Sequence, residues 1–127
     1  MSAGNLGTVQ QMMRYEKRFA FLKENIPFQS FHFHNYVVIS YQYFRADDES
    51  NGFKYLGKAN DLLEKYGKKL KMQEAGFGMA YAEAGAHYYR ERKYTKAKAI
   101  IEKGLEIMPD HLELKVRLDI VLDELRN

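Results

Sequence analysis

The chain contains 127 residues, of which 46% are hydrophobic, and this size predicts one compact domain with a core of its own. It has no cysteine, so disulfides, thiolate metal sites and thiol nucleophiles are excluded. The net charge of +3, from 20 basic and 17 acidic residues, is too small to indicate a strongly charged partner.

Neither a signal peptide nor a membrane span is visible in the sequence. Residues 1–10 are small and polar, and no stretch approaches about 18 apolar residues. We therefore expect a soluble protein, and the lack of cysteine favours the cytoplasm. Residues 1–8 are expected to be disordered, and an amphipathic helix is predicted over 9–25, ending before Pro27.

The segment 28–45 fits two secondary structures. Its content of Phe, Tyr, Val and Ile favours a strand, and its alternation is compatible with one. A lone strand would have no partner to pair with, however, and the flanking segments are helical. We predict a helix, because four apolar residues form a stripe at helical spacing: Phe33, Val37, Tyr41 and Phe44.

A further helix is predicted over 52–68, with Ser50 or Asn51 as its N-cap. An extra loop, 45–52, is expected to precede it.

The clearest pattern lies further along the chain and predicts a helical hairpin. Helices are expected over 73–92 and 94–107, and the small residues Gly85 and Ala97 would let them approach closely. The side chains that define the pattern recur at fixed spacings: Tyr81, Ala84, Gly85, Tyr88, Tyr94, Ala97, Ile101, Gly104 and Pro109.

A last helix is predicted over 111–125. Pro109 cannot continue the preceding helix, and Asp110 with Glu113 three positions later is typical of a capping box. The buried side of this helix is expected to consist of its apolar residues: Leu112, Leu114, Val116, Leu118, Ile120, Val121, Leu122 and Leu125.

The pattern over residues 77–109 resembles a tetratricopeptide repeat. The resemblance implies an all-α fold in which TPR-like hairpins stack as a short right-handed α-solenoid, with about six helices and a C-terminal capping helix. A shift of 38 residues places Ala59 on Ala97, and a shift of 47 residues places Val38 on Gly85. These shifts predict a second, degenerate copy upstream.

In tetratricopeptide arrays the first helix of each hairpin lines a concave groove that holds a peptide or a partner's helix. The resemblance therefore implies a protein or peptide partner, bound by outward-facing residues: His32, Asn35, Tyr36, Gln42, Tyr43, Met79, Glu83, Tyr89 and Arg90. For Tyr36, Tyr43 and Tyr89, packing between hairpins is an equally good interpretation. Ala82 and Ala86 stand where the family's carboxylate clamp has polar residues, so that clamp is not expected.

The sequence predicts a noncatalytic interaction scaffold, without an enzyme site, cofactor or metal. His32 and His34 are two residues apart, which splays them around a helix, and His87 is expected to be structural. One alternative is a self-associating structural or sensor part of a larger regulator, which allows a homo-oligomer. A helical-repeat module for RNA is less favoured, because the basic residues are mixed with acidic ones.

Overall fold

The structure is a computed structural model that describes residues 26–70 and 74–127. The disorder expected over 1–8 and the helix expected over 9–25 lie outside these residues. The described part is helical and contains no strand, which confirms the all-α prediction there. Its elements are α2 (Ile26–Arg45), α3 (Glu49–Tyr66), the short 3₁₀ helix η2 (Gly67–Lys69), α4 (Glu74–Arg90), α5 (Tyr94–Ile107) and α6 (Leu112–Arg126).

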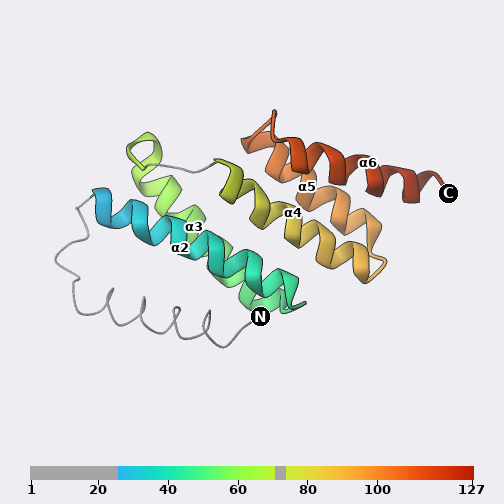
Figure 1. The fold of residues 1–127 in the computed structure, drawn as a ribbon, viewed down its shortest axis with the longest axis horizontal. Helices are drawn as coiled ribbons and strands as arrows, with labels where there is room; N and C mark the ends of the chain where they lie inside the picture. Colours follow the sequence, from blue (N-terminus) through green and yellow to red (C-terminus); the bar gives the residue numbers. More distant parts are fainter. Residues whose placement is uncertain (1–25, 71–73) are drawn as a thin grey trace.

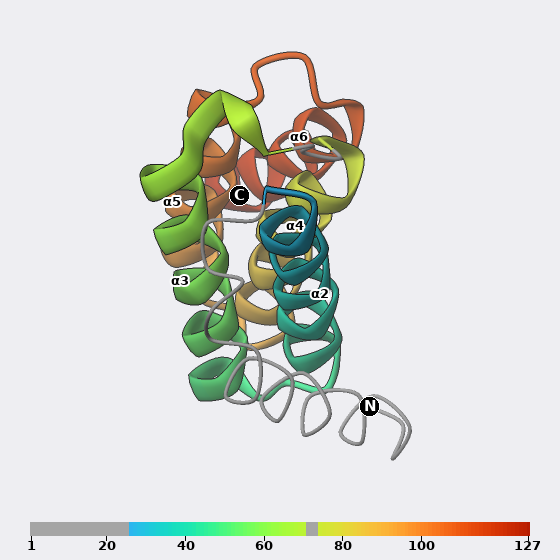
Figure 2. The same cartoon turned by 90° about the vertical axis from the view of Figure 1, so that its left-hand side faces the viewer.

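The helices form two hairpins and a final helix. α2 folds back on α3, α4 folds back on α5, and α6 packs on both α4 and α5 (Figure 1). The two hairpins meet through α2 and α4. Figure 2 shows α2 and α4 on one side of the molecule and α3 and α5 on the other. None of the helices in the described ranges combines the length and apolar character needed to cross a membrane.

The strand alternative for the segment 28–45 is wrong, because its apolar stripe is buried by helical packing. Phe33, Val37 and Phe44 are buried, and the Phe33 ring meets the edge of the Phe77 ring of α4 at 5.3 Å between centroids. The helical period places these side chains on one side of α2, where α3 and α4 cover them.

The hairpin of α4 and α5 closes at two small residues. A Cβ atom on Gly85 would lie 2.6 Å from Cγ1 of Ile101 and 3.8 Å from the carbonyl oxygen of Ala97. Gly85 and Ala97 therefore meet as expected, and the hairpin leaves no room for a larger residue at position 85.

The two hairpins have the same turn, displaced by 45 residues. The amide of Asp48 donates to the Tyr43 carbonyl at 2.9 Å, and the amide of Lys93 donates to the Tyr88 carbonyl at the same distance. Asp47 and Arg92, also 45 residues apart, both have a φ of 59°. This left-handed conformation reverses the chain between the two helices of each hairpin.

The displacement of 45 residues replaces the predicted shifts of 38 and 47, which are both wrong. It places Ser40, not Val38, on Gly85, and Gly52, not Ala59, on Ala97. The Ser40 hydroxyl donates to the Gly52 carbonyl at 2.7 Å, so these two residues form the close contact of the first hairpin. The extra length of this hairpin lies in α3, which has 18 residues against the 14 of α5, and in η2 after it, not in a loop before α3.

Two predicted helix caps are also wrong. Asp48, rather than Ser50 or Asn51, caps α3, because its Oδ1 accepts from the Asn51 amide at 3.1 Å. α3 consequently begins at Glu49, so the loop predicted over 45–52 is only a short turn over 46–48.

The cap of α6 is His111, not Asp110. The imidazole Nδ1 of His111 accepts from the Leu114 amide at 3.3 Å.

The buried side of α6 is narrower than predicted. Leu114 and Val121 are buried and Leu118 is partly buried. Four apolar residues that were predicted to be buried are exposed, because α4 and α5 cover only one side of α6. These residues are Leu112, Val116, Ile120 and Leu125.

Two glycines of α3 give a matched test of the Ser40–Gly52 contact. A Cβ atom on Gly52 would lie 2.6 Å from the ring of the buried Phe44, whereas one on Gly57 would meet nothing within 4 Å. We expect Gly52→Ala to lower the free energy of unfolding by about 1–3 kcal/mol through overpacking. Gly57→Ala is expected to raise it by about 0.5–1 kcal/mol, because alanine is the better helix former.

Urea denaturation of both variants measures these changes. Equal effects of the two substitutions would contradict the close approach of α2 and α3 at Gly52.

Candidate functional site

The first candidate site is a surface shared by α2, α4 and α6, which we call the three-helix face. α4 lies between the other two helices and contacts both. The side chains that define this face come from all three helices: Arg45, Glu83, Ala86, Arg90, Arg117 and Ile120.

Glu83 is the central charge of this face. Its carboxylate is only 8% exposed and forms ion pairs with Nε of Arg45 at 3.2 Å and with Nη2 of Arg117 at 3.5 Å. Both arginines are partly exposed, at 49% and 30%, so water screens these ion pairs and each of them stabilises the fold only modestly. Glu83 therefore links side chains of α2 and α6 to α4 on this face.

A cavity of about 170 Å³ opens between α4 and α6. Its walls are mostly apolar, and the two charged side chains that line it are both arginines, Arg90 and Arg117. Tyr89 closes one side, and its hydroxyl donates to Oε1 of Glu124 at 3.3 Å. The remaining lining residues are Gly85, Ala86, Ile101, Ile120 and Val121.

Arg90 is fixed by the turn of the first hairpin. Its Nε and Nη2 atoms donate to Oδ1 of Asp47 at 3.0 and 2.9 Å, and Nη2 also donates to the Phe44 carbonyl at 3.0 Å. The guanidinium is thus held at the rim of the cavity while its side chain remains 43% exposed.

The predicted site residues of α4 lie on or beside the three-helix face. Tyr89 and Arg90 line the cavity, and Met79 is partly buried. Glu83 was predicted to bind a partner, but in the structure it pairs with two arginines of the chain itself.

The predicted residues of α2 lie elsewhere. Tyr36 and Tyr43 are buried, and both rings contact the Tyr55 ring of α3. His32 is also buried.

Asn35 donates to the Phe31 carbonyl within its own helix at 2.8 Å, and Gln42 is partly buried. At the displacement of 45 residues, the α2 positions that match Met79, Glu83 and Arg90 are instead His34, Val38 and Arg45. The correct displacement could have been found from the aligned pairs Tyr36/Tyr81, Tyr43/Tyr88 and Arg45/Arg90.

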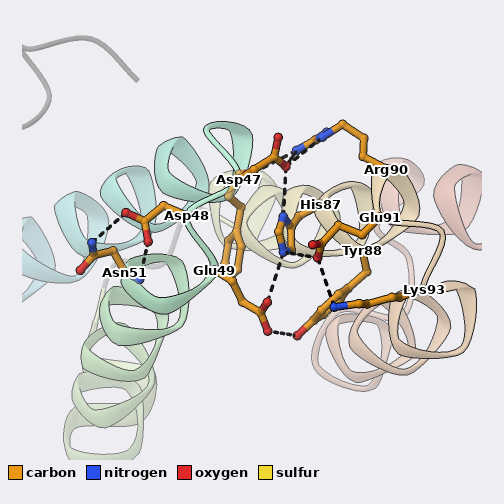
Figure 3. Close-up of polar contacts among 10 residues, drawn as sticks. Asp47, Asp48, Glu49, Asn51, His87, Tyr88, Arg90, Glu91 and Lys93 are labelled. Carbon is orange, nitrogen blue, oxygen red and sulfur yellow. Dashed lines mark hydrogen bonds and ion pairs between the residues drawn. The ribbon is translucent and has the colours of Figure 1, made fainter.

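The second candidate site is a polar group around His87, which we call the His87 cluster: Asp47, Glu49, His87, Tyr88 and Glu91. The His87 side chain is only 3% exposed, and its Nδ1 atom lies 3.0 Å from Oδ1 of Asp47. Its Nε2 atom lies 3.4 Å from Oε2 of Glu49 and 3.0 Å from Oε1 of Glu91. Figure 3 shows the imidazole between these carboxylates.

The cluster changes the acidity of its members. Hydrogen bonds from His87 and then Arg90 lower the pKa of Asp47, and the hydrogen bond from the Tyr88 hydroxyl lowers the pKa of Glu49. Burial, followed by that same hydrogen bond, raises the pKa of Tyr88 to about 12. The carboxylates of Asp47 and Glu49 are therefore held in their ionised forms.

Sequence reasoning missed the His87 cluster. Asp47 and Glu49 lie about 40 residues before His87 and were assigned to a loop. The only local signal was Glu91, one helical turn after His87.

Three of the basic residues between positions 90 and 98 pair with acidic ones. Arg90 pairs with Asp47, Lys93 with Glu91, and Lys98 with Glu102. This pairing leaves less charge available for phosphate groups.

The lowered pKa of Asp47 makes a pH-dependent prediction. A carboxylate whose pKa is lower in the folded chain stabilises the fold above its ordinary pKa of about 3.8, and this stabilisation is lost as the pH falls through the lowered value. We expect Asp47→Asn to lower the free energy of unfolding at about pH 5 and to have a progressively smaller effect toward about pH 2.5. Urea denaturation across this range measures the difference.

The exposed Asp119 provides the control variant, Asp119→Asn. If Asp47→Asn and Asp119→Asn show the same dependence on pH, Asp47 is not stabilised by His87 and Arg90.

No protein-family model matches the sequence, and no curated protein or solved structure resembles it at a significant level.

Proposed function

We propose that the chain is a noncatalytic interaction scaffold that binds a partner peptide on the three-helix face. In this proposal the hairpins α2–α3 and α4–α5 are tetratricopeptide-like repeats, stacked as a short right-handed α-solenoid with α6 as its cap. The repeated turn and the contacts of α4 with both α2 and α6 support this arrangement. The helix predicted over 9–25 would bring the total to six.

The observation that carries the proposal is the apolar cavity between α4 and α6. Its volume of about 170 Å³ is close to the roughly 150 Å³ of an engineered apolar cavity that binds benzene. A leucine or phenylalanine side chain of a partner therefore fits its size and chemistry. Insertion of such an anchor into a desolvated pocket is the usual source of affinity in peptide recognition.

The charges at the rim of the cavity determine which peptide residue is favoured next to the inserted apolar side chain. Its two charged lining residues, Arg90 and Arg117, are both cationic. Arg90 already pairs with Asp47, and Arg117 pairs with Glu83 and Glu113, but both guanidinium side chains remain partly exposed, at 43% and 30%. An acidic residue next to the apolar anchor would complement these guanidinium groups. We therefore propose a partner peptide that carries an apolar residue directly followed by aspartate or glutamate.

The proposal can be tested with a library of capped 12-residue peptides that contain a fixed Leu-Asp or Phe-Glu pair. Fluorescence anisotropy measures the affinity of the peptides selected by the full chain. Replacing the acid by its amide is expected to weaken binding about threefold to tenfold, and added salt should weaken the acidic peptide selectively.

Variants of the cavity provide the second arm of this test. Ala86→Leu fills the cavity, and Ile120→Ala removes part of its wall. We expect Ala86→Leu to weaken binding at least about tenfold. Val116→Ala is the matched control, because Val116 lies one turn before Ile120, is equally exposed, and does not line the cavity. Peptides that bind Ala86→Leu as tightly as the unaltered chain would refute the proposed surface.

A second candidate function, self-association, is favoured by the outer side of α6. Three apolar residues spaced one turn apart are exposed there: Leu112, Val116 and Ile120. In an antiparallel pair of α6 helices centred on Val116, Leu112 of each copy would lie beside Ile120 of the other.

The charges that flank this stripe are self-complementary in the same arrangement. Lys115 of one copy would lie beside Asp119 of the other. On the opposite flank Arg117 would lie beside Glu113 of the other copy, in exchange for its 2.8 Å ion pair with Glu113 of its own chain. A contact between single helices is smaller than a standard interface, so we expect a weak dimer.

Sedimentation velocity at concentrations from about 10 µM to about 500 µM tests this second candidate. We expect dimerisation on the order of 100 µM and its loss in Val116→Glu, which introduces a charge into the stripe. Ile107→Glu, at an exposed position of α5, serves as control and should dimerise normally. A monomer at all concentrations would exclude the α6 contact and leave peptide binding unaffected.

A further inference from the structure

We propose that His87, Glu49 and Glu91 bind a divalent transition-metal ion such as Zn²⁺. This site is separate from the peptide surface and departs from the sequence analysis, which predicted no metal. One ligand atom from each side chain lies within 4.8 Å of the other two, although the residues come from the start of α3, from α4 and from the turn after α4 (Figure 3).

The distances within the site suit a metal ion. Zinc binds imidazole nitrogen and carboxylate oxygen at about 2.0–2.2 Å, so two ligands at a tetrahedral angle are about 3.4 Å apart. Nε2 of His87 lies 3.4 Å from Oε2 of Glu49 and 3.0 Å from Oε1 of Glu91. The two glutamates are about 40% exposed, so their side chains can close on an ion without repacking the core.

The placement of protons gives the strongest reason for a cation. Nδ1 of His87 faces the carboxylate of Asp47, and donates to it when the proton of the neutral imidazole is on Nδ1. Nε2 is then an acceptor, and it faces the oxygen atoms of Glu49 and Glu91, which are acceptors too. These three acceptor atoms repel one another, and a metal ion bound between them would attract all three. A second proton on His87, carried by Nε2, would also make this arrangement attractive and is the alternative to a metal ion.

The surrounding hydrogen bonds match those that orient metal ligands in proteins. Metal-binding histidines usually donate their other ring nitrogen to a carboxylate, as His87 does to Asp47. Asp47 is itself held by two atoms of Arg90. The second oxygen of Glu49 accepts from the Tyr88 hydroxyl at 2.7 Å, which leaves Oε2 directed toward His87.

The donor set also selects the class of ion. One imidazole nitrogen with two carboxylate oxygens suits Zn²⁺ or Mn²⁺, whereas Ca²⁺ and Mg²⁺ prefer oxygen ligands alone. The one neighbouring cation close to a ligand atom, among the described residues, is Lys93, at 3.7 Å from Oε1 of Glu91. This exposed pair is weak and can yield to an ion.

Isothermal titration of zinc chloride into the metal-free full chain tests the site, and thermal unfolding gives a second readout. We expect one Zn²⁺ per chain and a rise in Tm, because the ion links the two hairpins. Glu91→Gln and Glu49→Gln should weaken Zn²⁺ binding at least about tenfold and remove most of the rise in Tm. Asp47→Asn, which leaves all three ligands in place, should weaken binding about 10–100-fold.

Glu102→Gln is the matched control, because Glu102 is an exposed glutamate of α5 outside the cluster. It should bind Zn²⁺ as the unaltered chain does. All of these variants change partly exposed side chains, so we expect each of them to fold. Absence of zinc binding would overturn the proposal in favour of a second proton on His87. Binding that is unchanged in both Glu49→Gln and Glu91→Gln would also overturn it, because neither carboxylate would then be a ligand.

Discussion

The close approach of two helices at a pair of small residues is the constraint on which the structure depends. Gly85 has no room for a side chain because Ile101 of α5 occupies the space, and Gly52 is confined in the same way by Phe44. The short distance between the two helices of a hairpin requires a tight turn between them. The turn of the first hairpin places Asp47 and Glu49 beside the end of α4.

Local signals predicted the second hairpin well and the first one poorly. Pro109 and the spacing of Gly85 and Ala97 indicate where α5 lies, and these signals act over one or two turns of helix. The first hairpin has Ser40 and Gly52 at the same positions. A serine that donates to a backbone carbonyl can replace glycine there, but a search for glycine and alanine does not find it.

The candidate sites show what a sequence pattern leaves out. Tyr89 and Arg90 both line the cavity, and their placement on α4 depends only on the helical period. The cavity beside them also needs Arg117 and Ile120, whose positions depend on how α6 crosses α4. The error of two residues in the upstream alignment moved the expected surface from His34, Val38 and Arg45 to side chains that include the buried Tyr36 and Tyr43.

Asp47 of the His87 cluster also contacts the three-helix face, because one of its carboxylate oxygens accepts from both His87 and Arg90. Occupancy of one site therefore alters the electrostatic field at the other. Thermodynamic linkage requires such an influence to be equal in both directions: if an ion at His87 changes the affinity for a ligand at Arg90, that ligand changes the affinity for the ion by the same factor. A single turn residue in the left-handed conformation is thus the point at which the two equilibria are joined.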